Sequence, residues 1–479
     1  MERHFESLSN VIACYAIALS DFLITLIAAS SDLIESLSKG TSYLITGVPK
    51  ASPSVTNNPH PSRTAGIGTA VVEALKTGSN SNFIRVRFMS KAVVIHHTLN
   101  TLGGETTVAI ETIESLYQLG YEVELVTVQR PDLEKISQSY GKKIHIARTK
   151  PLLPFKLNYL GVYQRLLTML SLIDFKDSDV VINTHGGALP YRIPGNVAYL
   201  LYLYFPTFLM NSTGIYGSNK YRKSFFWRAY FKPYSMISRY LAMRATTRPN
   251  LILTISKFSR EAITEAFPGV HPYILYPPVD IERFSRAYSQ PINAREQKVL
   301  VVSRFTPEKR IENAIKIAHI LGGKIKFQIV GSLAPANRPY FKRLQQMIEK
   351  YDLSQTVNLT PNASNEELID SMSKSMIYLH TMIGEHFGVS IVEAMAAGLV
   401  PIVPAYGGCS EIVPTDHQYR TVEEAADRIA KNAKYADDEK RVKMHEISMQ
   451  FSPDNFRKAM SLYIEQARSQ INVYRSSST

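Results

Sequence analysis

Residues 384–398 read GEHFGVSIVEAMAAG, and this stretch decides the fold and the chemistry expected of the chain. It sets Glu385 and Glu393 eight positions apart on either side of Gly388, and a helical pattern then runs to Gly398, a residue suited to ending a helix. Glycine before a helix lets backbone N–H groups approach an anion, and the helix N-terminus favours phosphate. Two carboxylates would repel a ligand that is only phosphate. They therefore indicate a ligand that also carries hydroxyl groups, such as a sugar nucleotide.

Outward from this stretch, the chain alternates short apolar runs, glycine turns and amphipathic segments. Strands are expected at residues 92–96, 121–128, 143–147, 180–183, 199–204, 251–256, 298–303, 325–330, 357–359 and 376–380. Helices are expected at residues 106–119, 311–321, 340–351, 365–373 and 453–469. Strands that alternate with helices predict parallel sheets covered on both faces. The fold class is therefore α/β, with two Rossmann-like domains that face a central cleft.

The 479 residues are enough for two or three domains. Because prolines cluster between residues 272 and 291, we expect an N-terminal acceptor-binding domain at 89–285, a C-terminal nucleotide-sugar domain at 286–452 and a final helix and tail at 453–479. Residues 1–88 differ in composition: an apolar run, residues 11–30, has nearly the length that spans a bilayer, and a Pro/Ser-rich linker follows. This extension is either a membrane anchor or translated sequence upstream of a start at Met89.

The composition is that of an ordinary globular protein, with 45% hydrophobic and 20% charged residues. With only two cysteines, the chain has no disulfide framework and no cysteine-based metal site. Its net charge of +13 is concentrated between residues 207 and 250, where eight basic residues stand among aromatic ones without an acidic residue.

This basic and aromatic segment is typical of contact with an anionic membrane surface or a lipid phosphate. An exposed loop and helix, or a nucleic-acid contact, would have the same composition. We expect a membrane or lipid contact rather than nucleic acid. The candidate residues are Lys220, Arg222, Lys223, Trp227, Arg228 and Lys232.

A second element, Arg304 and Lys309, follows the expected strand at residues 298–303. Two cations at the carboxyl end of a strand could neutralise a diphosphate, to which arginine can donate two parallel hydrogen bonds. The alternative is a solvated cluster, although cations are unfavourable at a helix start.

Two further features lie at expected strand ends in the N-terminal half. Gly103 and Gly104 permit close backbone approach to a phosphate or sugar, and His185 is a candidate contact to the transferred sugar. A full G-x-G-x-x-G is lacking, which disfavours a nicotinamide dinucleotide.

Taken together, these motifs resemble the GT-B retaining glycosyltransferases of family 4. The resemblance covers about residues 91–470 and rests on Arg304-x4-Lys309, Glu385-x7-Glu393 and YGGCSEIV (406–413). Within that family, LHTMIGEHFGVSIVEAMAAG, TPEKRIENAI, YPPVD and YFPT resemble the α-1,2-mannosyltransferase branch that extends dolichol-linked oligosaccharide. That branch uses GDP-mannose, which the resemblance therefore implies as the donor.

The resemblance also implies roles for single residues. Arg304 and Lys309 would hold the donor diphosphate, Glu393 the ribose hydroxyls, and Glu385 would face the transferred sugar. The implied donor-binding residues are Arg304, Lys309, Glu385, His386, Phe387, Gly388, Val389, Glu393, Gly103 and Gly104. Such enzymes use neither a metal nor a cofactor, because cations and a helix dipole stabilise the leaving phosphate.

One position departs from the branch, which usually has histidine where this chain has Tyr204, in the stretch 203–207. Tyrosine is a poor base near neutral pH, since its reference pKa is about 10. His185 matches the place of the donor-site histidine of the wider family, so the catalytic set expected is Glu385, His185, Arg304 and Lys309.

The expected protein is therefore a mannosyltransferase at a cytoplasm-facing membrane surface, peripheral or anchored, that acts on a lipid-linked or other glycan. Three alternatives stay open: a transferase that uses a UDP- or ADP-sugar, an inactive membrane scaffold of the same fold, and a GT-B epimerase or phosphorylase.

Overall fold

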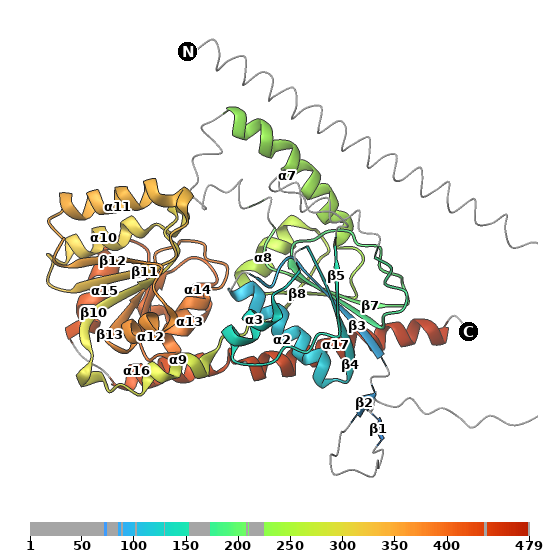
Figure 1. The fold of residues 1–479 in the computed structure, drawn as a ribbon. Helices are drawn as coiled ribbons and strands as arrows, with labels where there is room; N and C mark the ends of the chain where they lie inside the picture. Colours follow the sequence, from blue (N-terminus) through green and yellow to red (C-terminus); the bar gives the residue numbers. More distant parts are fainter. Residues whose placement is uncertain are drawn as a thin grey trace, which may run out of the picture. The chain divides into compact units, whose positions relative to one another are not determined.

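The computed structural model describes residues 71–73, 85–87, 90–100, 103–128, 130–152, 173–206, 209, 225–434 and 438–477 (Figure 1). The predictions for the apolar run 11–30, the linker and the start at Met89 lie outside these residues. One compact unit, residues 70–218 and 238–479, contains both large sheets. The other unit contributes to the description only the first part of α7 (Phe225–Ala245).

The first large sheet has seven parallel strands in the order β5-β4-β3-β6-β7-β8-β9. Its strands are β3 (Ser90–His96), β4 (Tyr121–Thr127), β5 (Arg148–Pro151), β6 (Val180–Gly186), β7 (Ala198–Leu203), β8 (Leu251–Thr254) and β9 (Tyr273–Ile274). Its helices include α2 (Gly104–Gln118), α3 (Leu133–Tyr140) and α8 (Lys257–Ala266). The central strands β6 and β7 are buried along their whole length, as strands of a parallel sheet that is covered on both faces are. A short antiparallel pair, β1 (Val71–Glu73) and β2 (Arg85–Arg87), precedes this sheet in the chain.

The second large sheet has six parallel strands in the order β12-β11-β10-β13-β14-β15. Its strands are β10 (Glu296–Val302), β11 (Lys326–Gly331), β12 (Val357–Pro361), β13 (Ser375–Leu379), β14 (Val400–Pro404) and β15 (Gln418–Tyr419). Two separate cores lie on its two faces, because alternate residues of β10 join different clusters. One face carries α10 (Ile311–Ile320), α11 (Arg338–Lys350) and α15 (Val422–Lys434), and the other α9 (Ile281–Tyr288), α12 (Asn365–Ser373), α13 (Val389–Ala396) and α16 (Asp438–Met449) (Figure 1).

The remaining elements are short, apart from the last helix, α17 (Pro453–Ser477). The 3-10 turns are η3 (Ile292–Ala294), η4 (Pro307–Lys309), η5 (Pro335–Asn337) and η6 (Thr415–His417), and α14 spans Cys409–Ile412. In the part of the chain that the structure describes, no helix is long and apolar enough to cross a bilayer.

The α/β class with two parallel sheets is confirmed, and the expected helix at residues 365–373 has the bounds of α12. The strand expected at residues 143–147 is wrong, because the chain joins the sheet only at Arg148. Its side chains explain the difference: His145 binds Glu114 at 3.0 Å and stacks on Tyr117 at 3.7 Å, which holds the middle of the segment against α2. The chain reaches β4 only at its end, where the amide of Ala147 donates to the carbonyl of Val123 at 2.9 Å.

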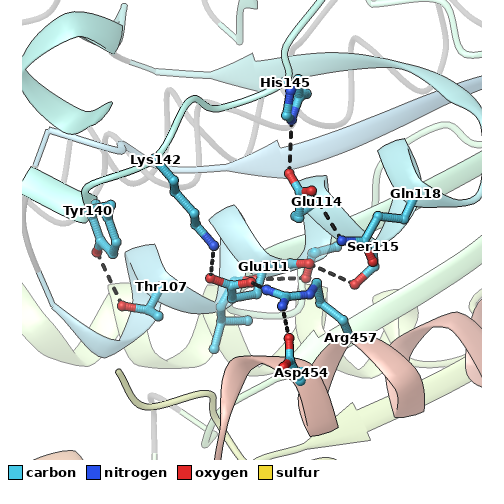
Figure 2. Close-up of polar contacts among 12 residues, drawn as sticks. Thr107, Glu111, Glu114, Ser115, Gln118, Tyr140, Lys142, His145, Asp454 and Arg457 are labelled. Atoms are coloured by element: carbon cyan, nitrogen blue, oxygen red, sulfur yellow. Dashed lines mark hydrogen bonds and ion pairs between the residues drawn. The ribbon is translucent and has the colours of Figure 1, made fainter. Parts of the chain in front are cut away.

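The last helix, α17, is bound to α2 of the first domain through a buried carboxylate. Glu111 on α2 is 2% exposed and lies between the cations of Lys142 and Arg457, with which it forms ion pairs (Figure 2). Arg457 on α17 also pairs with Asp454, one turn earlier (Figure 2). Because a buried charge without a partner is costly, this cluster fixes the position of α17 on α2.

We predict that Glu111→Gln destabilises the fold strongly, because it leaves the cations of Arg457 and Lys142 without their carboxylate. The expected loss is on the order of 3 kcal/mol, measured as the shift of the urea-unfolding midpoint. The matched control is Asp370→Asn, which breaks the exposed Asp370–Lys374 pair of 2.6 Å and is expected to cost roughly 0.5 kcal/mol or less. Equal shifts for the two variants would contradict a clamping role for Glu111.

Candidate functional site

The loop that carries Glu385 and His386 is held by a second loop, residues 406–408. The amide of Gly384 donates to the carbonyl of Tyr406 at 3.0 Å, and the amide of Gly408 donates to the carbonyl of Glu385 at 2.6 Å. A Cβ atom on Gly408 would lie 2.0 Å from the carbonyl oxygen of His386. The close approach therefore requires glycine at that position, and it fixes the backbone on which Glu385 stands.

Glu385 forms an ion pair with Lys309, with 2.6 Å between Oε2 and Nζ. The same oxygen lies 3.4 Å from Nε2 of His380. Burial by itself raises the pKa of Glu385, but Lys309 and His380 outweigh burial and hold the pKa well below its usual value. The carboxylate is therefore ionised at neutral pH and can accept a hydrogen bond from a hydroxyl group.

Lys309 reaches this carboxylate from the loop after β10. It ends a 3-10 turn, and its carbonyl accepts a 2.6 Å hydrogen bond from the hydroxyl of Thr381. The following residue, Arg310, has φ 51, a left-handed backbone that is uncommon outside glycine. The loop after β10 and the acidic motif thus meet at Glu385.

His380 is the residue that the sequence analysis missed. It directly follows β13, it is 3% exposed, and burial lowers its pKa although Glu385 acts in the opposite direction. Its position at the carboxyl end of a parallel strand was the signal that could have identified it.

Arg304 lies apart from this cluster. Its side chain is 67% exposed and its Nη2 is 4.0 Å from Oε1 of Glu308, a surface pair of small energetic weight. The structure therefore places Lys309, but not Arg304, in contact with the acidic motif. That Arg304 binds a diphosphate stays a prediction.

Glu393 lies in α13, and its surroundings shift its pKa in the direction opposite to that of Glu385. Burial raises its pKa to about 7, with Arg283 lowering it and Asp280 raising it. Both of these groups stand at the start of α9, which packs against α13. One motif thus contains a carboxylate that stays ionised and another that titrates near neutral pH.

The helix α13 begins at Gly388, whose φ of 102 disfavours any other residue. Val389, the first residue of the helix, contacts the glycine turn of the first sheet: a Cβ on Gly104 would lie 2.9 Å from its Cγ2. A Cβ on Gly103 would have open space. Close packing against the Val389 side chain therefore favours glycine at position 104, and no such preference acts at position 103.

His386 and Phe387, both among the implied donor-binding residues, place aromatic rings beside the acidic motif. The His386 ring stacks on Phe205 at 4.2 Å, and burial lowers its pKa to about 4, so it is neutral at pH 7. Phe387 is 2% exposed and contacts Tyr276 and Phe451 at centroid distances of 5.8 and 5.4 Å.

His185 is buried at the end of β6, with its ring edge against His97 at 5.1 Å. The ring of Tyr204 leaves no room for a side chain at Gly186, where a Cβ atom would lie 2.1 Å from that ring. The hydroxyl of Tyr204 donates to the carbonyl of Thr184 at 3.1 Å, and burial raises its pKa well above 10. Tyr204 is therefore no base near neutral pH, and its contacts hold the backbone beside His185.

The basic segment is described only in part. Lys220, Arg222 and Lys223 lie outside the described residues, as do the side chains of Trp227 and Arg228, while Lys232 is exposed on α7. Within the described ranges, no three His, Cys, Asp or Glu side chains are grouped so as to hold a metal ion.

Two protein-family models match the chain in succession. Residues 102–283 match the model described as Glycosyltransferase Family 4, and residues 284–449 match the model described as Glycosyl transferases group 1.

Two curated relatives are mannosyltransferases. The GDP-Man:Man(3)GlcNAc(2)-PP-Dol alpha-1,2-mannosyltransferase of Dictyostelium discoideum is 27% identical over 217 residues, which are 41% of this chain and 43% of that protein. The alpha-1,3/1,6-mannosyltransferase alg2 of Schizosaccharomyces pombe is 25% identical over 361 residues, 67% of this chain and 69% of that protein. The match to the first relative thus spans less than half of that protein's length.

Among solved structures, Anabaena HepE in complex with UDP superposes with a TM-score of 0.57 at 15% identity, over 78% of this chain and 100% of that one. A likeness at this identity concerns the fold alone.

Proposed function

The chain belongs to the GT-B glycosyltransferases, with a Family 4 domain followed by a group 1 domain, and we propose that it transfers mannose from GDP-mannose to a lipid-linked glycan with retention at the anomeric carbon. The observation that carries this proposal is the Lys309–Glu385 pair of 2.6 Å beside the glycine-initiated helix α13. Here Lys309 supplies a cation for a leaving phosphate, and Glu385 supplies an ionised acceptor for sugar hydroxyls. The N-terminus of α13 supplies backbone amides for an anion.

In the proposed reaction, the bond between the anomeric carbon and the diphosphate oxygen breaks, and its electron pair leaves with the diphosphate. An acceptor hydroxyl forms the new bond on the same face, and its proton passes to the departing phosphate oxygen. Lys309, Arg304 and the amides at the start of α13 stabilise the charge that develops on that phosphate. Glu385 orients the sugar through its hydroxyl groups, and Glu393 takes the ribose.

The donor and acceptor are inferred from the relatives. The names of the Dictyostelium and Schizosaccharomyces proteins both specify mannosyl transfer, and the first specifies GDP-mannose and a dolichol-linked glycan. HepE was solved with UDP, so a UDP-sugar is the alternative that a donor panel must exclude.

Contact with a membrane is supported by the exposed face of α7 and the turn that follows it. Arg239, Tyr240, Met243, Arg244 and Arg248 are exposed, with Tyr240 56% and Met243 48% accessible. Arg244 lies over the Tyr240 ring at 5.8 Å, which keeps a cation beside an aromatic body. Basic heads with apolar bodies on one helix face suit the interface of an anionic bilayer.

We predict that the intact protein transfers mannose from GDP-mannose, but not from UDP- or ADP-sugars, to a pyrophosphate-linked Man3GlcNAc2 acceptor. Glu385→Ala is expected to lower kcat by about 100-fold or more while GDP binding persists, because Lys309 stays available to the diphosphate. Lys309→Ala is expected to weaken GDP binding roughly tenfold or more, since it removes the partly buried cation that faces the motif. Radiolabelled transfer and GDP titration calorimetry measure the two effects. Full transfer by the Glu385 variant would overturn the site, and preference for another nucleotide would overturn the donor.

We predict that donor binding releases protons near neutral pH. Burial raises the pKa of Glu393 to about 7, so the free protein is partly protonated there, whereas ribose hydroxyls favour the carboxylate as their acceptor. Donor binding lowers this pKa, and affinity therefore increases as pH rises through 7 and levels off above it. GDP-mannose titrations in buffers of different ionisation enthalpy count the protons, because a diphosphate diester has no ionisation of its own in this range. Glu393→Gln is expected to abolish the release, and an unchanged proton count would exclude the ribose role.

We predict that the protein binds vesicles that contain anionic lipid and that Arg239→Glu with Arg244→Glu reduces this binding at least tenfold, because two attractive charges become repulsive. Flotation with phosphatidylserine-containing and purely zwitterionic vesicles measures it. The matched control, Lys342→Glu with Lys350→Glu, makes the same charge change on exposed positions of α11. If both pairs reduce flotation equally, net charge and not the α7 face is responsible.

A further inference from the structure

One exposed aromatic ring stands directly beside the acidic motif and has no part in the donor chemistry proposed above. Tyr406 is 51% exposed, although its backbone is anchored to the Glu385 loop by the 3.0 Å hydrogen bond from Gly384. The neighbouring residue, Gly407, forms a β-bridge with Glu385. The main chain of Tyr406 is therefore held against the loop that carries the carboxylate paired with Lys309.

The Tyr406 ring is supported from behind by other rings. It contacts Phe258 edge to face at 5.3 Å. Phe258 in turn stacks on Phe205 at 5.9 Å, and Phe205 on His386 at 4.2 Å. This aromatic row, His386–Phe205–Phe258–Tyr406, begins in the acidic motif and ends at the exposed tyrosine.

The row draws its members from both parts of the chain. His386 and Tyr406 come from loops of the six-stranded sheet, whereas Phe205 follows β7 and Phe258 lies in the first turn of α8, beside the seven-stranded sheet. Next to Phe258, the carboxylate of Glu411 accepts hydrogen bonds from the amides of Lys257 and Phe258 at 2.8 and 2.6 Å. This contact caps α8 and keeps the middle of the row in register with the Tyr406 loop.

A pyranose ring is a ligand that can stack on an exposed aromatic ring such as that of Tyr406. It presents C–H groups on its faces and hydroxyl groups around its edge. Sites that bind such ligands combine aromatic walls with a few polar groups. The donor sugar is assigned to Glu385 itself, and Phe258 connects Tyr406 to the domain expected to hold the acceptor. A sugar on Tyr406 would therefore be the acceptor's.

We infer that Tyr406 is the stacking platform for the terminal sugar of the acceptor glycan; this rests on the proposed glycosyl transfer. The side chain binds substrate, while the main chain of the same residue holds the Glu385 loop. Substitution of the ring leaves the main-chain anchor intact, so the two roles can be separated.

The test compares Tyr406→Ala and Tyr406→Phe in steady-state kinetics with GDP-mannose and pyrophosphate-linked Man3GlcNAc2. The alanine variant is expected to raise the acceptor KM roughly tenfold, with an unchanged donor KM and unchanged hydrolysis of the donor when acceptor is absent. The phenylalanine variant keeps the ring and is expected to behave as the unmodified protein. The matched control is Tyr273→Ala, a tyrosine of β9 that is 45% exposed and also contacts a second ring, that of Tyr463.

Saturation-transfer NMR with soluble Man3GlcNAc2 makes the test independent of catalysis. Signals from the ring protons of the terminal mannose are expected with the unmodified protein and with Tyr406→Phe, but not with Tyr406→Ala. An unchanged acceptor KM in Tyr406→Ala, a parallel rise of the donor KM, or no glycan signal with the unmodified protein would each overturn the platform. A glycan signal without transfer would instead count against the proposed function and leave the platform supported.

Discussion

The site depends on one steric constraint, the contact of two backbone loops at Gly407 and Gly408. The carbonyl and amide groups of residues 384–386 lie so close to these glycines that a Cβ at either position would meet backbone atoms at 2.8 Å or less. Once the contact forms, the position of Glu385 is determined, and Lys309 and His380 are within reach of the same carboxylate oxygen. The ion pair therefore depends on backbone packing as well as on charge attraction, because ordering two flexible side chains in one geometry costs conformational entropy.

The fold could be largely predicted from the sequence, because hydrophobic periodicity reports burial residue by residue. The strand β7, buried along its full length, appears as a continuous apolar run. The segment at residues 143–147 was wrongly predicted as a strand because its alternation of apolar and polar residues reflects packing against α2. Ile144 is buried, but Lys142 and His145 bind Glu111 and Glu114 on α2. Periodicity shows that a residue is buried and does not show against which element.

The candidate site could be predicted only as far as short motifs reach. The spacing of Glu385 and Glu393 and the glycine before α13 are local properties, and the prediction of a donor site rests on them. His380 was missed, since its partner Glu385 lies in a loop whose course depends on Gly407 and Gly408. Arg304 was grouped with Lys309 by sequence proximity, yet the two side chains differ in environment: that of Arg304 is 67% exposed and that of Lys309 16%.

The opposite ionisation of the two motif carboxylates is the property that no motif could reveal, and it follows from what each acid packs against. Both are partly buried, which raises a carboxyl pKa in each case. Glu385 receives a cation from the loop after β10 and a histidine from the end of β13, so its charge is compensated. Glu393 faces Asp280 as well as Arg283, and its charge is compensated only in part. In the proposed donor complex this difference has a use: the ionised Glu385 would orient the reacting sugar, whereas Glu393 would give up its proton as the ribose binds. The eight-residue spacing thus places two acids of the same type in environments that suit two different steps.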